Sequence, residues 1–194
     1  MTFLRIACAA AMFAAGLIAL PAPASEMQSF TLDGARSQVS ARVALFGLAS
    51  KTAHFPEISG RIALDPARPE AIDLNVTLNA RALRASDTVT LGRLKGPSFF
   101  DVEHHPSVRF IGRSMRMTGT RSAEVAGELT ARGVTRREVL QVTFDQAPSA
   151  NTGREPIGFT GTTTINRRDY GMTAYSLIVG NRVTITIKAR MVPA

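Results

Sequence analysis

The densest group of chemically reactive side chains in this sequence lies between residues 101 and 105, where Asp101, Glu103, His104 and His105 stand together. Imidazole and carboxylate groups are common ligands of zinc and other transition metals, so this group invites a metal-binding interpretation. On an extended strand, however, His104 and His105 would point to opposite faces and could not readily share one ion. We therefore expect a structural or solvent-exposed role for the segment and predict no metal site.

The residues needed for nucleophilic catalysis are not found in a recognisable arrangement. Such catalysis requires a nucleophile beside a base that a third group orients. The histidines are His54, His104 and His105, no serine stands in a G-x-S-x-G pattern, and the single cysteine is Cys8. We predict no catalytic residues, no enzymatic activity and no cofactor.

The elements that position side chains in this chain are indicated by strict alternation of apolar and polar residues. The apolar set Val183, Ile185, Ile187, Ala189 and Met191 alternates with polar residues, and residues 72–79 follow the same pattern. A period of two is typical of a strand buried on one face. A shift of one residue in register would expose the whole apolar set, so each strand has a defined inner face.

Similar segments and turn signals recur along the chain and predict an all-β fold. One stretch, residues 81–100, breaks the alternation, and its leucines fit a short helical insert. The pattern is not that of βαβ units, which favours an antiparallel barrel or sandwich, and the number of long strands favours a closed barrel of about eight. Strands are expected at residues 28–33, 39–46, 52–55, 58–65, 71–79, 107–117, 124–131, 138–146, 157–165 and 181–192.

The N-terminus has the features of a secretory signal peptide. Arg5 precedes an apolar run from Ile6 to Leu20, and Ala22-Pro23-Ala24 has the small residues of a cleavage site. We expect residues 1–24 to be removed and residues 25–194 to form one domain in the periplasm or outside the cell. Because Cys8 lies in the removed segment, the mature domain needs an ordinary hydrophobic core without disulfides.

The chain is strongly basic, with a net charge of +8 and a pI near 10.9. Removal of Arg5 leaves 22 basic and 15 acidic residues, a net charge of +7. This charge is compatible with a solvated basic exterior or with an anionic membrane surface as partner. An exported protein seldom meets nucleic acid, so we expect none as a partner.

Three stretches and an early hairpin region together resemble the YceI-like family of exported, polyisoprenoid-binding proteins. The stretches are Phe99-Phe100-Asp101-Val102 with Pro106 and Phe110, then Gly127-Glu128-Leu129-Thr130 with Gly133-Val134-Thr135, and finally residues 166–172, NRRDYGM. The hairpin region runs from Val43 through Phe55 to Ile62. The resemblance covers roughly residues 30–191, and the combination is far more specific than any one motif.

This resemblance implies a lipocalin-like barrel whose apolar cavity accepts an isoprenoid chain, such as a polyprenyl lipid or a quinone tail. The implied function is non-catalytic carriage or sequestration of an amphiphile by a monomer or homodimer. The alternative is a periplasmic stress-response or interaction module, with a barrel filled by side chains, that docks a membrane enzyme such as a quinone-linked cytochrome.

The residues expected to contact the ligand come mainly from the apolar faces of the strands. Phe99 and Phe100 fit either a core plug that seats the helical insert or direct ligand contact. Arg167 fits either a turn closed at Gly171 or a guanidinium at the cavity mouth that binds a lipid phosphate. The full predicted set is Val43, Leu45, Leu74, Val76, Phe99, Phe100, Phe110, Leu129, Val142, Phe159, Arg167, Ile185 and Ile187.

Overall fold

The computed structural model describes residues 27–46, 49–65, 68–151 and 153–194, so the predicted signal peptide lies outside the described residues. In this part of the chain the strands form one antiparallel sheet. They are β1 (Gln28–Leu32), β2 (Gln38–Leu45), β3 (Ala49–Phe55), β4 (Ile58–Asp65), β5 (Arg68–Asn79), β6 (Arg84–Ala85), β7 (Ser107–Met117), β8 (Ser122–Ala131), β9 (Val134–Phe144), β10 (Ile157–Asn166) and β11 (Val179–Pro193).

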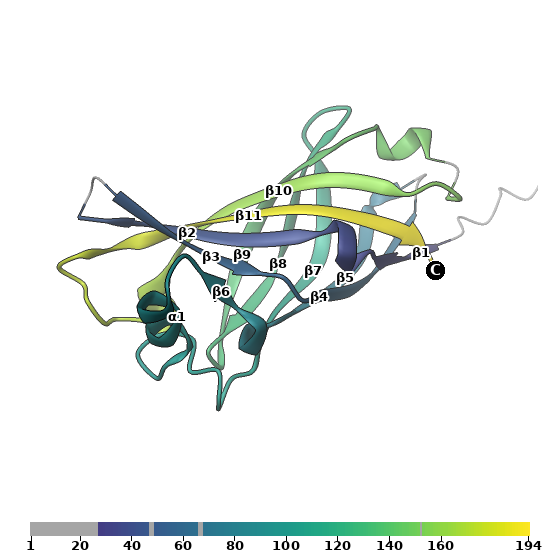
Figure 1. Ribbon diagram of the computed structural model, residues 1–194. Helices are drawn as coiled ribbons and strands as arrows, with labels where there is room; N and C mark the ends of the chain where they lie inside the picture. The colour runs from purple at the N-terminus through teal and green to yellow at the C-terminus, as the bar shows by residue number, and fades with distance from the viewer. Residues whose placement is uncertain (1–26, 47–48, 66–67, 152) are drawn as a thin grey trace, which may run out of the picture.

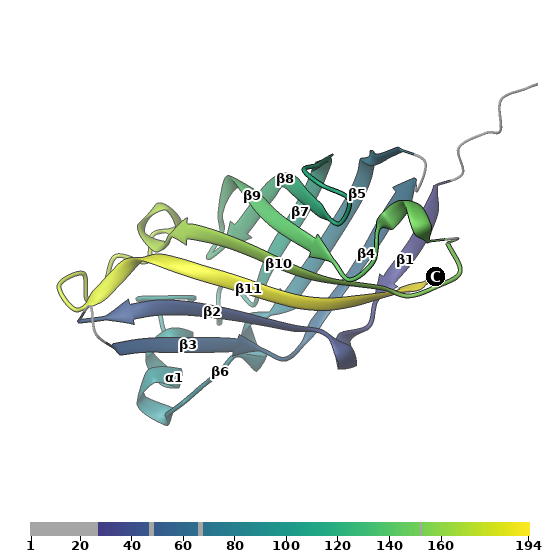
Figure 2. The same ribbon diagram turned by 90° about the horizontal axis from the view of Figure 1, so that it is seen from above.

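The sheet closes into a barrel because β11 pairs with both β10 and β1 (Figures 1 and 2). The closed circuit runs β1, β4, β5, β7, β8, β9, β10, β11 and back to β1, which is eight strands among the described residues. The N-terminal part of β11, between Val179 and Lys188, pairs with β2, whereas the C-terminal end of β11 pairs with β1. Strand β2 in turn pairs with β3. The predicted all-β antiparallel barrel of about eight strands is confirmed.

The alternation predicted from the sequence is visible strand by strand. In β8, Ala123, Val125, Gly127, Leu129 and Ala131 are buried, whereas the residues between them are exposed or half-buried. Gly127 faces inward at a point of close approach, where a Cβ atom would lie 2.7 Å from the Phe110 ring and would also meet the Ile111 carbonyl. The inner face of β8 therefore has no space for a larger side chain at this position.

The ladder between β9 and β10 is shorter than those on either side of it. It runs only from Phe144 opposite Phe159 to Gln141 opposite Thr162. Beyond Gln141, residues 134–140 of β9 continue to pair with β8 alone. The two strands therefore separate toward one end of the barrel.

The predicted helical insert is confirmed, but its α-helix is much shorter than residues 81–100. It contains η2 (Ala80–Ala82), then β6, and then α1 (Thr88–Lys95), which Asp87 caps by accepting from the Thr90 N–H at 2.8 Å. Gly92 lies inside α1, and Gly96 ends it. No helix among the described residues is long and apolar enough to cross a membrane. The other short helices are η1 (Gly34–Arg36), η3 (Pro148–Ala150) and η4 (Arg167–Tyr170).

The two ends of the barrel differ in how they are filled. The end near β1 and the C-terminus is closed by a packed apolar cluster. The other end is bordered by α1, by the β2–β3 hairpin and by the connection between η4 and β11 (Figure 1). We call the first the packed end; its buried members are Phe30, Ile62, Leu64, Leu74, Met115, Ala123, Val125, Leu140, Val142, Phe144, Ile157 and Met191.

The close approach at Gly127 yields a stability prediction. Replacing Gly127 with Ala should lower the free energy of unfolding by about 1–3 kcal/mol, because the new methyl group overlaps the β7 backbone. The matched control is Gly92→Ala in α1, where a Cβ meets nothing within 4 Å. That change should stabilise the protein by about 0.5–1 kcal/mol through helix propensity. Urea denaturation of both variants tests this; equal effects would contradict the described packing.

Candidate functional site

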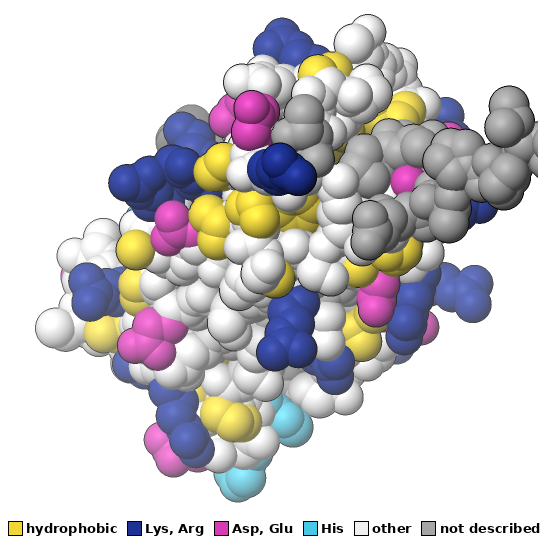
Figure 3. All heavy atoms as spheres, turned by 90° about the vertical axis from the view of Figure 1, so that its right-hand side faces the viewer, with side chains coloured by type: hydrophobic (Ala, Val, Ile, Leu, Met, Phe, Trp, Pro, Cys, Tyr) yellow, Lys and Arg dark blue, Asp and Glu magenta, His cyan; other side chains and the backbone are white. Residues whose placement is uncertain are grey.

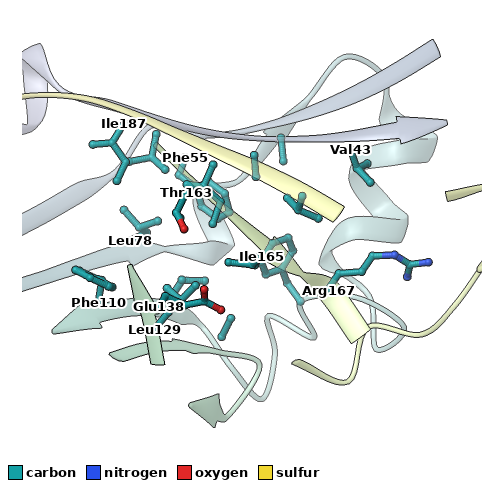
Figure 4. A pocket seen from close by; sticks show the side chains of 18 of the residues that line it. Val43, Phe55, Leu78, Phe110, Leu129, Glu138, Thr163, Ile165, Arg167 and Ile187 are labelled. Carbon is teal, nitrogen blue, oxygen red and sulfur yellow. The ribbon is translucent and has the colours of Figure 1, made fainter. Parts of the chain in front are cut away.

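The interior of the barrel contains an apolar cavity of about 170 Å³ between the packed end and α1. Figure 4 shows Ile187 and Phe110 toward one end of it and Val43 and Arg167 toward the other. Lys51 also lines the cavity, and its side chain is 38% exposed, so the cavity reaches the surface beside the β2–β3 hairpin. We call this opening the mouth.

Most residues predicted from the sequence to contact a ligand line this cavity. They come from strands on opposite sides of the barrel and from the segment after α1. Those that line it are Val43, Leu74, Val76, Phe99, Phe100, Phe110, Leu129, Phe159, Arg167, Ile185 and Ile187.

Two residues of the predicted set, Leu45 and Val142, are not among the cavity lining. Val142 faces inward, as its alternation requires, but it lies in the packed end, where neighbouring side chains fill the interior. Leu45 is on the same face of β2 as Val43, but it pairs with Ala49 and Val179 at the outer end of the strand. Alternation predicts the face of a strand and not the position along the barrel, which explains why these two residues lie outside the cavity lining.

Aromatic side chains line the cavity on the side of α1. The rings of Phe55 and Phe100 meet edge to face, with centroids 5.6 Å apart. The ring of Phe99 is buried and stacks on Tyr175, with centroids 6.0 Å apart and an angle of 10° between the planes. Phe99 and Phe100 therefore both seat the insert and line the cavity, so their two predicted roles are compatible.

Arg167 is buried at the end of β10, with only 2% of its surface exposed. Its guanidinium donates to four backbone carbonyls, those of Met172, Ala174, Val179 and Gly180. Burial, followed by the nearby charge of Arg168, lowers the pKa of Arg167. The side chain holds the connection from η4 to β11 in place, and four of its five N–H donors are used in this way within the described residues.

Glu138 is a polar group in the cavity wall that the sequence reasoning missed. It is half-buried, lines the cavity beside Leu129 (Figure 4), and accepts a hydrogen bond of 2.8 Å from the Tyr170 hydroxyl. Burial, then the bond to Glu138, raises the pKa of Tyr170, which keeps the hydroxyl protonated. Extending the apolar alternation of β9 backwards from Leu140 would have placed Glu138 on the inner face.

The Asp101–His105 group forms a turn and not an extended strand. The backbone N–H groups of His104 and His105 both donate to the Asp101 carbonyl, and His104 Nδ1 lies 2.9 Å from an Asp101 carboxylate oxygen. The ring of His105 lies instead against Gly133. Within the described ranges, no three His, Cys, Asp or Glu side chains are arranged to hold a metal ion.

A model of the YceI-like domain matches residues 30–191, which is most of the chain. The chain belongs to this family. The resemblance noted in the sequence is thereby confirmed. The matched range contains every strand of the YceI-like barrel, apart from the first two residues of β1 and the last two of β11.

The relatives of this YceI-like domain are similar over most of their length. A UPF0312 protein of Pseudomonas putida is 29% identical over 171 residues, which are 88% of this chain and 86% of the relative. A UPF0312 protein of Pseudomonas savastanoi pv. phaseolicola is 29% identical over 164 residues, covering 84% and 85% of the two chains.

Two solved structures show the same fold as this YceI-like domain. BcnA of Burkholderia cenocepacia superposes with a TM-score of 0.73 at 22% identity, covering 82% of this chain and 98% of BcnA. A polyisoprenoid binding domain from Saccharophagus degradans has a TM-score of 0.67 at 12% identity, covering 86% of this chain and 99% of that domain. At these identities the likeness establishes the fold.

The structural role of Arg167 predicts a large loss of stability on its removal. Arg167→Met should lower the free energy of unfolding by about 2–4 kcal/mol, because four buried or partly buried backbone carbonyls lose their donor. Arg168→Met is the matched control, and because Arg168 is exposed the change should stay within about 0.5 kcal/mol. Urea denaturation measures both, and an unaffected Arg167→Met protein would show that the four bonds are not needed for folding.

The turn at residues 101–105 predicts a titration effect. The hydrogen bond and then the charge of Asp101 raise the pKa of His104 above its ordinary value of 6.5. A raised pKa means that protonated His104 is favoured in the folded state, so its contribution is present below pH 6.5 and is lost as the pH rises through the raised value. NMR titration should show this shift, and Asp101→Asn should remove most of it. An unchanged His104 titration in that variant would contradict the assigned cause.

Proposed function

We propose that this protein is an exported, non-catalytic carrier that binds an amphiphile by taking its isoprenoid chain into the barrel. The observation that carries the proposal is an apolar cavity, inside a closed barrel, that reaches the surface at one end. Membership of the YceI-like family supports it, as does the likeness of fold to a domain described as polyisoprenoid binding.

The proposed affinity comes from burial of the chain. Each buried methylene contributes about 0.8 kcal/mol, so a prenyl tail binds with few polar contacts. The cavity volume of 170 Å³ slightly exceeds the roughly 150 Å³ that holds one benzene in an engineered cavity of another protein. The resting cavity thus has room for about one isoprene unit, and a longer tail must displace the lining rings of Phe55, Phe99 and Phe100 or extend through the mouth.

The polar groups of the cavity favour a ligand without a phosphate deep inside the barrel. Most N–H donors of Arg167 already bind backbone carbonyls, and the Lys51 ammonium forms an ion pair of 2.8 Å with Asp87. The carboxyl group of Glu138 offers oxygen acceptors, which suit a ligand hydroxyl and not a phosphate. A polyprenol or quinone tail is therefore the proposed cargo, and any charged head group would lie outside the mouth.

The test of the proposed function is native mass spectrometry of the protein secreted by its own host and purified without detergent. We expect a retained isoprenoid lipid or quinone, identified after extraction, and a protein mass lacking residues 1–24. The same spectrum reports whether the protein is a monomer or a homodimer. A ligand-free protein would overturn the carrier and favour an interaction module that docks a membrane enzyme.

A cavity variant locates the bound lipid. Val76→Asp places a charge in the cavity lining and should abolish lipid retention, since burying an unpaired carboxylate beside the tail is costly. Thr162→Asp on the exposed face of β10 is the control and should retain the lipid. If Val76→Asp does not fold, Ala41→Phe reduces the same cavity without adding charge. Lipid retained by a folded cavity variant would contradict the site.

A further inference from the structure

Three segments that are distant in sequence form a ring around the mouth of the cavity. The β2–β3 hairpin contributes residues 42–46 and 49–52, and α1 and its cap contribute residues 87–95 (Figure 1). The connection before β11, together with the start of that strand, contributes residues 171–182. We call these segments the mouth ring. The cavity lining includes Val43, Lys51, Thr90, Met172 and Val179 from the ring, so the ring borders the cavity directly.

Direct contacts hold the ring together. The Phe46 N–H donates to the Ile178 carbonyl at 2.8 Å, which joins the hairpin to the connection. The Arg93 guanidinium lies 5.2 Å from the centroid of the Tyr175 ring, which joins the connection to α1. Lys51 and Asp87 form an ion pair of 2.8 Å, which joins α1 back to the hairpin. The ring is therefore one continuous surface.

Large apolar side chains are exposed mainly on this ring. Of the six large hydrophobic residues that are exposed among those described, four lie on it: Phe46, Val89, Tyr175 and Leu177. Leu177 is 97% exposed and Phe46 is 68% exposed. Phe46 and Tyr175 also adopt positive φ angles of 51° and 55°, a conformation that is costly for aromatic residues. A soluble surface gains nothing from this arrangement, which is typical of an interaction site.

The charge of the ring is strongly biased toward one sign. It contains Arg42, Lys51, Arg93, Lys95 and Arg182 and one acidic residue, Asp87. This excess of four positive charges is half of the chain's net charge of +8. The opposite end of the molecule, seen in Figure 3, shows side chains of both signs with hydrophobic side chains between them. Basic residues beside exposed apolar residues match an anionic lipid surface.

We propose that the mouth ring is the surface by which this protein docks on an anionic lipid bilayer. The apolar side chains enter the interfacial region, the basic side chains contact the head groups, and the mouth opens toward the acyl chains. An isoprenoid chain then passes between bilayer and cavity without crossing water. This last step rests on the proposed function, whereas docking itself requires no cargo.

One contact connects the docking surface to the interior. Tyr175 on the ring stacks on Phe99, which lines the cavity. Insertion of Tyr175 into a lipid surface would remove this stacking partner from Phe99 and free its ring to move. The ring surface and the Phe99 side of the cavity therefore respond to the same event.

The test of docking is co-sedimentation of the ligand-free protein with vesicles. We expect binding to phosphatidylcholine vesicles that contain phosphatidylglycerol, weakening as salt rises, and much weaker binding to phosphatidylcholine alone. Leu177→Asp should reduce the binding at least about tenfold, because an apolar anchor is lost and a negative charge is added. The matched control is Val139→Asp, since Val139 is exposed on β9 outside the ring, and it should bind as the wild type does.

Two outcomes would overturn the docking surface. One is the absence of vesicle binding by the wild-type protein, in which case a protein partner for the ring becomes the better explanation. The other is an equal loss in Leu177→Asp and Val139→Asp, which would place the binding elsewhere. Neither outcome bears on whether the purified protein retains a lipid, so failure of docking and failure of the proposed function remain distinguishable.

Discussion

The closure of the sheet through β11 is the constraint on which the rest of this structure depends. This one strand pairs with β10 along its length, with β1 near its C-terminus and with β2 toward its other end. The pairing satisfies the backbone groups that two open edges would leave exposed, and it separates an inside from an outside. Without it, the alternating side chains would line a two-sided sheet and would enclose no volume.

Closure alone does not make a cavity, because the interior must also be left unfilled. At the packed end, side chains such as Phe30, Phe144 and Met191 are buried against one another. Toward α1 the inward residues include smaller ones, such as Ala41 and Val43, and the space between them stays open. The cavity therefore results from the sizes of the inward side chains along the barrel, while the alternation itself continues from one end to the other.

Most of the fold can be predicted from the sequence because the alternation of apolar and polar residues is a local property. Residues 72–79 and 183–191 each indicate a strand and its inner face without reference to any partner. The depth of a residue along the barrel depends on register with distant strands. Alternation alone therefore places Val142 in the cavity lining, whereas the structure places it in the packed end.

Polar residues were the least predictable part of the site. Arg167 and Arg168 are identical in type, yet Arg167 is buried and donates to four backbone carbonyls, whereas Arg168 is exposed. That difference arises from the path of the connection to β11, which no local pattern encodes. Glu138 illustrates the opposite case, since the alternation of β9 did contain the information and only its polar character argued against an inward position.

The separation of β9 from β10 has a mechanical consequence for the barrel wall. Beyond Gln141 and Thr162 the two strands share no ladder, and the hydrogen bond from Tyr170 to Glu138 ties η4 to β9 across that part of the wall. Where neighbouring strands are paired, moving them apart would break rows of backbone hydrogen bonds. That constraint is absent along this seam, so among the described strands this is a place where the wall can widen beside Glu138.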